Sequence, residues 1–394
     1  QGEDMDRKKI CFFTGSRAEY GLLRPLILKV KNENEFQIQI IASGTHLSPE
    51  FGLTYREIEQ DGFVIDEKIE MLLSSDTGIG VAKSMGVALI GYSDALNRLK
   101  PDVLVVLGDR FEALAIATAA YVLKIPIAHI HGGEKTIGAL DDAFRHSITK
   151  MSCLHFASTE EYRKRIIQLG EHPRTVFNVG AIGLDNLRGI DFLSKEELER
   201  ELNFKFGSKN ILFTYHPTTL KMEKIDAEMA EIFSALSDLV TSGYKIIITK
   251  SNADEGGRYI NKLVDEFAQK NGMNVLAITS MGTLRYLSVM KYVDFVMGNS
   301  SSGIVEAPSL KVPTINIGER QKGRVKGNSV IDVEPCKNKI LHAVKIVEQM
   351  DKAMITNPYD NGGASEKIYA VLKNNLENNC LDIRKEFFDI DFDL

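Results

Sequence analysis

The sequence predicts an α/β protein built from two Rossmann-like domains that face a central cleft, followed by C-terminal helices. Along its 394 residues, short β-branched runs alternate with helical patterns, which is typical of doubly wound parallel sheets. The alternation restarts near residue 205, after a charged helix, and this restart predicts a second domain of the same kind. The length agrees, since it corresponds to roughly two to three domains of the usual size.

Six apolar runs in the first half of the chain predict parallel strands that are buried on both faces. These runs are Ile10–Thr14, Gln37–Ala42, Val103–Leu107, Pro126–His129, Leu154–Ala157 and Val176–Val179. The helical patterns between them include Tyr20–Val30, Arg110–Leu123 and Thr159–Leu169. We assign residues 5–185 to this first domain.

A charged helix and five further apolar runs predict the second domain, which we assign to residues 205–360. The helix is expected over Ser194–Leu202, because Ser194 and Glu197 have the spacing of a capping box. The strands that follow are Ile211–Tyr215, Lys245–Thr249, Val275–Ile278, Phe295–Met297 and Thr314–Ile317. Lys337–Asn375 then predicts two helices around a turn at Asn357–Tyr359. We expect residues 361–394, a helix and a tail, to pack back on the first domain.

The composition is that of an ordinary globular protein, and it excludes several functional classes. Apolar residues make up 44% and charged residues 26%, and 48 basic against 54 acidic residues give a net charge of −6. An acidic chain has no general attraction for nucleic acid. Lys124 and Pro126 divide the longest apolar stretch, Ala113–Ile130, so we expect no membrane span and no membrane partner. The four scattered cysteines and the lack of a visible signal peptide favour a cytoplasmic protein.

Ligands of parallel α/β sheets bind at the carboxyl ends of the strands, so the residues directly after the strands are candidates for chemistry. The first strand ends in Gly15-Ser16-Arg17-Ala18-Glu19-Tyr20, where a small turn and a helix N-terminus favour an anion. This is not a G-x-G-x-x-G fingerprint, so no nicotinamide or flavin cofactor is expected. Val103–Leu107 ends in Gly108-Asp109-Arg110, where Asp109 can act on a ligand or cap the next helix.

The densest group of titratable residues follows the run Pro126–His129. His129-Ile130-His131-Gly132-Gly133-Glu134 is followed by Asp141-Asp142 and then by Arg145-His146. One histidine alone is commonly structural, but two histidines, a glutamate and two aspartates around one strand end favour a functional site. Neither H-E-x-x-H nor another dedicated metal spacing is present, so we expect no protein-bound metal.

The strand ends of the second half carry groups suited to an anion. His216 follows the first of these strands, where it can act on a ligand or cap the strand. The Gly-Asn-Ser-Ser-Ser-Gly segment 298–303 opens a helix that carries Glu306, and its hydroxyl and N–H groups can surround an anion or only cap that helix. The basic loop 318–324 contains Arg320, and it can balance the same charge or be a solvated charge run.

Taken together, these segments resemble the hydrolysing UDP-N-acetylglucosamine 2-epimerases of bacterial sialic-acid biosynthesis. The matching motifs are Gly15-Ser16-Arg17-Ala18-Glu19-Tyr20-Gly21, Gly108-Asp109-Arg110, His129-Ile130-His131-Gly132-Gly133-Glu134, Arg145-His146-Ser147-Ile148-Thr149-Lys150, His216-Pro217, Gly298-Asn299-Ser300-Ser301-Ser302-Gly303 and Gly318-Glu319-Arg320-Gln321-Lys322-Gly323-Arg324. They occur in the family's order between about Ile10 and Asp332. The resemblance implies the two-domain fold of GT-B glycosyltransferases, with UDP on the second domain and the sugar facing the first.

The resemblance also implies roles for single residues. Asp109, Glu134 and Asp141 correspond to catalytic carboxylates, and His216 corresponds to the residue near the leaving diphosphate. The implied UDP-binding residues are Arg17, Arg110, Asn252, Gly282, Ser300, Ser301, Glu306 and Arg320. Some relatives have a glutamate where this chain has His131, so either His131 or Glu134 does the work of that carboxylate.

The reaction implied by the resemblance converts UDP-N-acetylglucosamine and water into N-acetylmannosamine and UDP. UDP leaves, a base removes the C2 proton to form a glycal, and water adds from the opposite face. No cofactor is needed. The alternatives are the same hydrolysis of UDP-2,4-diacetamido-2,4,6-trideoxyglucose, a non-hydrolysing epimerase, a UDP-sugar glycosyltransferase and a nucleotide-sugar sensor. We expect the protein to form a homodimer or homotetramer and to bind the UDP-sugar as its substrate.

Overall fold

The computed structural model describes the chain except for residues 1–6, 76, 136–139, 219–220, 252–254 and 394. The chain forms two compact units. Unit 1 consists of Gln1–Asn186 and Tyr359–Leu394, and unit 2 is Leu187–Pro358. Unit 2 is therefore a continuous segment inserted into unit 1, and it starts before residue 205, where the sequence placed the second domain.

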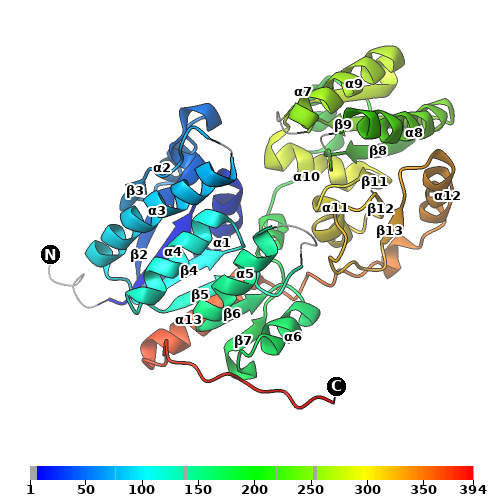
Figure 1. Ribbon diagram of the computed structural model, residues 1–394. Helices are drawn as coiled ribbons and strands as arrows, with labels where there is room; N and C mark the ends of the chain where they lie inside the picture. Colours follow the sequence, from blue (N-terminus) through cyan, green and yellow to red (C-terminus); the bar gives the residue numbers. More distant parts are fainter. Residues whose placement is uncertain (1–6, 76, 136–139, 219–220, 252–254, 394) are drawn as a thin grey trace. The chain divides into compact units, whose positions relative to one another are not determined.

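Unit 1 is built on a seven-stranded parallel sheet with the strand order β3-β2-β1-β4-β5-β6-β7 (Figure 1). The strands are β1 (Lys9–Thr14), β2 (Gln37–Ser43), β3 (Glu67–Ile69), β4 (Val103–Leu107), β5 (Ile127–Ile130), β6 (Leu154–Ala157) and β7 (Val176–Asn178). Every residue of β4 and β5 is buried, as expected for central strands that are covered on both faces. Because β1, β4 and β5 are parallel neighbours, the loops after them meet at one edge of the sheet.

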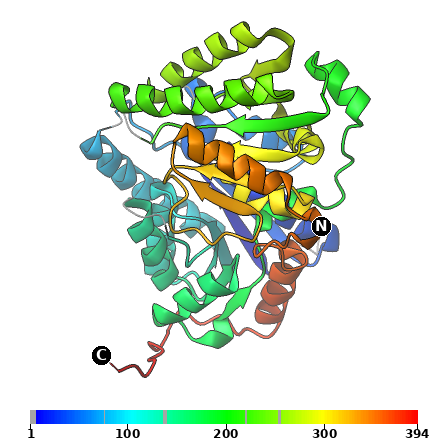
Figure 2. The same cartoon turned by 90° about the vertical axis from the view of Figure 1, so that its right-hand side faces the viewer.

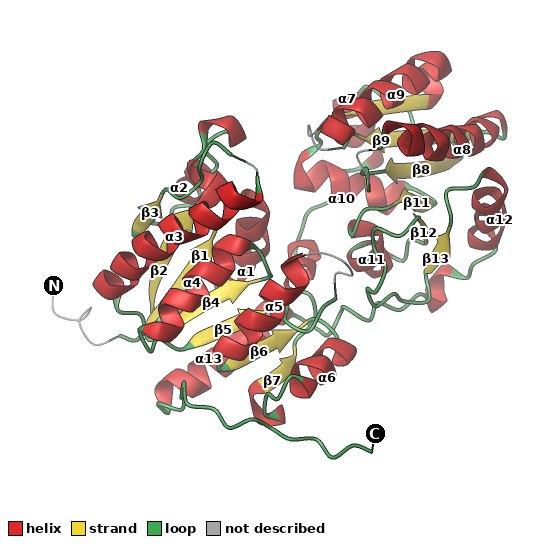
Figure 3. Cartoon of the chain, in the orientation of Figure 1, coloured by secondary structure: helices red, strands yellow, loops and turns green. Residues whose placement is uncertain are grey.

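Helices cover both faces of this sheet (Figure 3). They are α1 (Arg17–Glu33), α2 (Tyr55–Gln60), α3 (Gly78–Leu99), α4 (Phe111–Val122), α5 (Leu140–Met151), α6 (Glu160–Gln168) and α13 (Ala364–Glu377), with short 3-10 helices η1 (Gly44–Leu47), η2 (Pro49–Phe51), η3 (Pro173–Thr175) and η4 (Ile182–Leu187). Alternate residues of β1 enter two cores. Ile10 and Phe12 pack with α1 and α13, whereas Cys11 and Phe13 pack with α3 and α4.

The end of the chain belongs to unit 1. Ile368 and Leu372 of α13 are fully buried in the core that contains α1, and Lys373 pairs with Glu35 at 2.6 Å. The described residues beyond α13, 378–393, form no helix or strand, and Figure 2 shows this segment, in red, running past the strands and helices of unit 1.

Unit 2 is built on a six-stranded parallel sheet with the order β10-β9-β8-β11-β12-β13. The strands are β8 (Lys209–Thr214), β9 (Tyr244–Thr249), β10 (Val275–Ile278), β11 (Phe295–Gly298), β12 (Thr314–Ile317) and β13 (Val330–Val333). The helices are α7 (Lys195–Leu202), α8 (Met222–Thr241), α9 (Glu255–Asn271), α10 (Gly282–Tyr292), α11 (Ser302–Val305) and α12 (Lys337–Glu348), with 3-10 helices η5 (Gly272–Asn274), η6 (Ala307–Leu310) and η7 (Lys352–Met354).

The helix α7 explains why unit 2 begins at Leu187. Leu198 and Leu202 of α7 lie in one core with Val289 and Met290 of α10, so this helix is part of unit 2 and not a linker before it. The predicted capping box is present: Ser194 Oγ accepts from the Glu197 N–H at 3.1 Å, and the Ser194 N–H donates to Glu197 Oε2 at 2.8 Å.

Every strand expected from the sequence is present, with ends that are unchanged or shift by at most two residues. The edge strands β3 and β13 and the long helix α3 are additions that the apolar runs did not predict, whereas the other two edge strands, β7 and β10, were predicted. Within the described residues, no helix combines the length and the apolar character that crossing a bilayer requires.

Candidate active site

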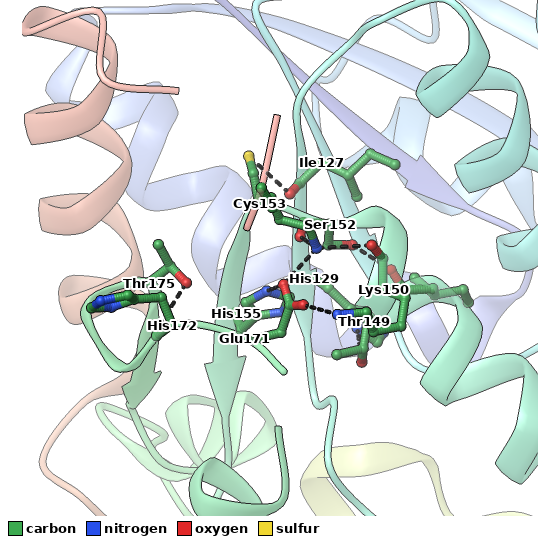
Figure 4. Close-up of polar contacts among 12 residues, drawn as sticks. Ile127, His129, Thr149, Lys150, Ser152, Cys153, His155, Glu171, His172 and Thr175 are labelled. Atoms are coloured by element: carbon green, nitrogen blue, oxygen red, sulfur yellow. Dashed lines mark hydrogen bonds and ion pairs between the residues drawn. The ribbon is translucent and has the colours of Figure 1, made fainter. Parts of the chain in front are cut away.

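The loop after β4 is fixed by a buried histidine of β5. His129 Nδ1 lies 3.1 Å from Thr149 Oγ1, a residue drawn with it in Figure 4. Its Nε2 lies 2.8 Å from the carbonyl oxygen of Gly108. Burial lowers the pKa of His129 to about 3, so the neutral ring donates to Gly108 and accepts from Thr149. His129 therefore has a structural role: it holds the residue directly before Asp109.

A buried guanidinium gathers the acidic residues of this edge. The Arg145 side chain of α5 is only 4% exposed and forms an ion pair with Asp109. Its NH1 group donates to the carbonyl oxygen of Glu134 at 2.9 Å and to Asp142 Oδ1 at 3.3 Å. Arg145 thus joins the loops after β4 and β5 to the first turn of α5, binding the carboxylate of Asp109 and the backbone of Glu134.

Asp141, the third carboxylate, lies in the first turn of the same helix. Burial raises its pKa, and the nearby Asp109 carboxylate raises it further, against the influence of Arg110 and Arg145. Asp109 has a guanidinium partner, while Asp141 is held in an environment that favours its protonated form. Carboxyl groups in different environments can act as acid and base in one reaction.

His131 and Glu134 both lie in unit 1, in the loop after β5. His131 has a left-handed backbone with φ 67°, and its Nε2 accepts the Ile182 N–H at 3.2 Å. Glu134 Oε1 accepts from Ser158 Oγ at 3.2 Å. His131 thus uses its Nε2 atom to hold the backbone at Ile182. Glu134 uses Oε1 for its contact with Ser158, and Oε2 takes no part in that contact.

Gly133 shapes this loop. Its φ is +80°, and a Cβ atom there would lie 2.2 Å from the carbonyl oxygen of Tyr162. Only glycine permits both the backbone conformation and this approach, which explains the glycine directly before Glu134.

The two arginines expected to bind UDP from unit 1 have protein partners. Arg110 Nε and NH2 lie 3.1 and 3.2 Å from the two carboxylate oxygens of Glu112, which is fully buried. Arg17 pairs with Glu57 at 3.1 Å, and its side chain is 66% exposed. The Arg110 side chain is also 43% exposed, so both arginines pair with a glutamate and both remain accessible to a ligand.

In unit 2, Asn299 ties the predicted residues to one another. The His216 N–H donates to Asn299 Oδ1 at 2.8 Å, and Asn299 Nδ2 donates back to the carbonyl oxygen of His216 at 2.8 Å. Arg320 NH1 donates to the carbonyl oxygen of Asn299 at 2.9 Å. The His216 ring lies with its Nδ1 3.0 Å from Ser251 Oγ. The ends of β8, β9 and β11 and the basic loop after β12 therefore form one polar region.

The serine segment follows Gly298, which has φ 131° and would place a Cβ 1.8 Å from the carbonyl oxygen of Thr214. Ser300 Oγ accepts from the Ser302 N–H at 3.3 Å and lies 3.0 Å from Ser302 Oγ. Ser301 makes no side-chain capping bond to α11. The hydroxyl group of Ser301 is thus the one that the helix itself does not use.

The remaining predicted UDP residues differ in their surroundings. Glu306 is half-buried, and burial raises its pKa to about 7 although Arg324 opposes this. Burial and the neighbouring Arg324 lower the pKa of Arg320. Gly282 is exposed at the start of α10, with φ +72° and open space around it. Asn252 lies outside the described residues.

In the described part of the chain, no three His, Cys, Asp or Glu side chains are grouped as a metal ion would need.

A family model described as "UDP-N-acetylglucosamine 2-epimerase" matches residues 28–373. The chain belongs to this family. The match covers both units and includes the loops after β4, β5, β8, β11 and β12.

Three curated relatives of this epimerase family member are similar over most of their length. A Campylobacter jejuni protein named "GDP/UDP-N,N'-diacetylbacillosamine 2-epimerase (hydrolyzing)" is 46% identical over 84% of this chain and 85% of its own. "Polysialic acid biosynthesis protein P7" of Escherichia coli is 40% identical over 97% and 98%. A Legionella pneumophila "UDP-N,N'-diacetylbacillosamine 2-epimerase (hydrolyzing)" is 33% identical over 93% and 96%.

A solved structure confirms the predicted fold class. The Neisseria meningitidis UDP-GlcNAc 2-epimerase bound to UDP-GlcNAc has a TM-score of 0.72, with 22% identity over 93% of this chain and 100% of that one. The two Rossmann-like sheets and the C-terminal helix are therefore those of a GT-B-like epimerase fold.

Three residues of the epimerase site region were not among the candidates from the sequence. Arg145 was quoted in a motif but received no role, because its partners Asp109 and Glu134 are distant in sequence. Glu19 and Glu112 lie buried behind the loops after β1 and β4. The Gly15 N–H donates to Glu19 Oε2 at 2.6 Å, and burial raises the pKa of Glu19 to about 7. The sequence does carry a signal for Glu19 and Glu112: each is a glutamate that follows shortly after the end of a strand and lies near an arginine in the sequence.

Proposed function

We propose that this epimerase family member is hydrolysing, and that it converts UDP-2,4-diacetamido-2,4,6-trideoxyglucose (UDP-N,N'-diacetylbacillosamine) and water into the free 2-epimer and UDP. The observation that supports the chemistry is the group of carboxyl residues organised by Arg145, with Asp109 paired and the pKa of Asp141 raised. A nucleotide-binding protein without chemistry would not need these carboxyl groups.

The two units offer groups for the two halves of such a substrate. Unit 2 supplies His216, Ser301, Glu306 and Arg320, which suit a nucleotide diphosphate: hydroxyl and cationic groups for phosphate and a carboxylate for ribose hydroxyls. Unit 1 supplies the acid and base groups for the sugar ring. This division is part of the proposal.

The proposed steps balance as follows. The C1–O bond breaks, and its electron pair leaves with the β-phosphate of UDP, assisted by His216 and Arg320. A carboxylate of unit 1 removes the C2 proton, whose acidity the cationic C1 centre increases, and a C1–C2 double bond forms. Water then adds hydroxyl to C1 and gives its remaining proton to a carboxylate of unit 1. A different, protonated carboxyl group delivers a proton to C2 from the face opposite to the one that lost it. Asp109, Asp141 and Glu134 are the proposed acids and bases, with His131 as the alternative to Glu134.

The choice of sugar rests on the relatives. Two of the three curated relatives described above carry names that specify N,N'-diacetylbacillosamine, including the one with 46% identity. They favour the diacetamido sugar over UDP-N-acetylglucosamine, which the motifs alone had favoured. UDP-N-acetylglucosamine stays as the second candidate, because the relative named for polysialic acid biosynthesis is 40% identical over nearly the whole chain. We also propose a cytoplasmic location and a homodimer or homotetramer, as expected from the sequence.

The test is a parallel assay in deuterated water followed by NMR. UDP-diacetamido-trideoxyglucose, its GDP counterpart and UDP-N-acetylglucosamine are each incubated with the protein. We expect free UDP and a 2-epimer that carries deuterium at C2, with the highest kcat/KM for the UDP-diacetamido sugar. Faster turnover of UDP-N-acetylglucosamine would establish the second candidate. Epimer still linked to UDP would contradict the hydrolytic step, and turnover without deuterium at C2 would contradict the proposed elimination.

A further inference from the structure

A second polar cluster of unit 1 lies behind the carboxyl site and contains a buried glutamate. Glu171, after α6, is 2% exposed. Its Oε1 lies 2.7 Å from His155 Nε2, and its Oε2 lies 2.6 Å from Lys150 Nζ (Figure 4). Burial alone would raise the pKa of Glu171, but these bonds lower it to about 2. Glu171 therefore carries a negative charge, paired with Lys150, beside the carboxyl end of α5.

The C-terminal segment supplies the remaining cation. Lys385 Nζ lies 2.5 Å from Glu171 Oε1, and its side chain is only 22% exposed. The same ammonium group donates to the carbonyl oxygens of Lys150 at 2.8 Å and Ser152 at 2.6 Å. These carbonyls are at the end of α5, so Lys385 caps that helix from a segment 233 or more residues away in sequence.

Backbone and ring contacts seat the segment around Lys385. The Phe388 N–H donates to the carbonyl oxygen of Gly170 at 2.9 Å, and the Phe388 ring lies 5.0 Å from the ring of His172. Lys150 Nζ lies 5.0 Å from the centre of the Phe387 ring. A Cβ on Gly170, whose φ is +94°, would lie 2.3 Å from Phe387. The segment thus fits closely against the loop that carries Glu171.

A chain of hydrogen bonds leads from this cap to the candidate catalytic residues. Thr149, in the last turn of α5, bonds to His129 Nδ1, and His129 Nε2 bonds to the carbonyl oxygen of Gly108, directly before Asp109. The first turns of the same helix carry Asp141 and Arg145, the partner of Asp109. A shift of the carboxyl end of α5 would therefore affect the position of Asp109 in two ways: through His129 and Gly108, and through Arg145.

We propose that Lys385 is a positioning residue of the epimerase: by capping α5 from the C-terminal segment, it fixes the helix and the His129 contact that together place Asp109 and Asp141. This inference rests on the proposed function, because its predicted effect on kcat can be measured only if the protein turns over a nucleotide sugar. Its structural part, the capping of α5, does not.

The experiment compares four variants of the full chain. Lys385→Met removes the ammonium group, Lys385→Gln keeps a neutral donor, and Lys385→Arg keeps a cation. Arg384→Met is the matched control, because the Arg384 side chain is 90% exposed and pairs with neighbouring Asp382. Glu171 keeps His155 and Lys150 in every variant. Hydrogen exchange, UDP affinity and the kcat and KM of the nucleotide sugar are measured for each.

In Lys385→Met we expect amide exchange at residues 148–153 to increase about fivefold, the usual effect of losing a cation at a helix end. We expect kcat to fall about tenfold with KM and UDP affinity nearly unchanged, because misplaced catalytic groups slow chemistry and not nucleotide binding. Lys385→Gln should be intermediate, and Lys385→Arg and Arg384→Met should behave like the parent.

Three results would overturn the proposal. Unchanged exchange at 148–153 in Lys385→Met would show that Lys385 does not cap α5. Faster exchange with unchanged kcat would show that the cap does not position the site. An equal loss of UDP affinity would indicate a general loss of stability. If the parent turns over neither nucleotide sugar, the proposed function fails, and the exchange data still decide whether the cap exists.

Discussion

At the scale of single residues, two buried glutamates of unit 1 have opposite pKa shifts. Burial raises the pKa of Glu19 to about 7, and the bonds to His155, Lys150 and Lys385 lower that of Glu171 to about 2. Glu171 stabilises the fold above its unfolded pKa of about 4.5, and this contribution is lost as the pH falls toward 2. Glu19 has the reverse sign: its contribution is present below pH 4.5 and is lost as the pH rises through about 7.

The variant Glu19→Gln tests this sign. An amide still accepts the Gly15 N–H but does not ionise, so the penalty for ionising a buried carboxyl group disappears. We expect the melting temperature of the variant, relative to the parent, to increase from pH 5 to about pH 7 and to level off above it. Melting curves at several pH values measure it. The surface variant Glu57→Gln should show no such trend, and a constant difference between Glu19→Gln and the parent would contradict the argument.

The carboxyl residues at Arg145 give a second prediction. Asp109→Asn and Asp141→Asn keep the shape of the side chain and remove the proton acceptor, so turnover should fall by about 10²–10⁴-fold. UDP affinity, measured by calorimetry, should stay close to that of the parent. Asp94→Asn is the control, since Asp94 is an exposed carboxylate of α3 in the same unit. Full turnover in both site variants would remove Asp109 and Asp141 from the proposed mechanism.

The nucleotide residues give the converse expectation. Ser301→Ala and Glu306→Gln should weaken UDP binding by about 1.5–3 kcal/mol each, the usual value of a hydrogen bond to a charged group. The conservative replacement at Glu306 keeps the side-chain volume near α11. Isothermal titration with UDP measures the effect, and Ser309→Ala in η6 serves as a comparison. Parent-like affinity in both variants would show that the serine segment does not hold the nucleotide.

At the scale of elements, the sequence predicted what apolar burial determines. Val103–Leu107 and Leu154–Ala157 were predicted to the residue, because central parallel strands need continuous apolar runs. Edge strands need less burial, and the Glu-Lys-Ile segment of β3 carries two charges, so it has no such run. The helix α3 contains four glycines, at positions 78, 80, 86 and 91, and its packing against α4 and the sheet compensates for their low helix propensity.

The candidate site was predictable at strand ends and unpredictable in its pairings. Motif position located Asp109, Glu134 and Asp141, but it could not indicate that Arg145 joins the first two. A guanidinium partner depends on how α5 packs, which no local pattern encodes. The role of His129 also depends on packing, since it is full burial that makes this histidine neutral and structural.

The loop after β11 gives a prediction at this scale. Gly298→Ala forces a Cβ against the Thr214 carbonyl oxygen at a φ of 131°, so we expect a loss of about 3 kcal/mol or more in unfolding free energy, together with weaker UDP binding. Gly86→Ala is the control, because nothing lies within 4 Å of its Cβ position in α3. That change should be neutral or stabilising by up to about 1 kcal/mol. Chemical denaturation distinguishes the two, and equal stabilities would contradict the strain argument.

At the scale of the whole molecule, exposed apolar side chains on α3 and α4 bear on the expected self-association. Ile90 is 70% exposed and Val122 is 72% exposed. If the protein is a homodimer or homotetramer through this surface, the double variant Ile90→Glu with Val122→Glu should reduce the molar mass measured by light scattering. Met273→Glu, at an 86% exposed position of η5, should not. An unchanged mass in the double variant would exclude these helices as the interface.

The insertion of unit 2 between Asn186 and Tyr359 sets the order in which a ribosome completes the two units. Leu187–Pro358 is contiguous, so all of its strands have been synthesised before α13 exists. Until Ile368 and Leu372 are translated, part of the apolar surface around α1 lacks its cover. A stop codon after residue 358 would therefore leave every strand of both sheets in the product, yet deprive the first unit of the helix that closes its core. The apolar surface left uncovered at that stage can promote aggregation of the nascent chain.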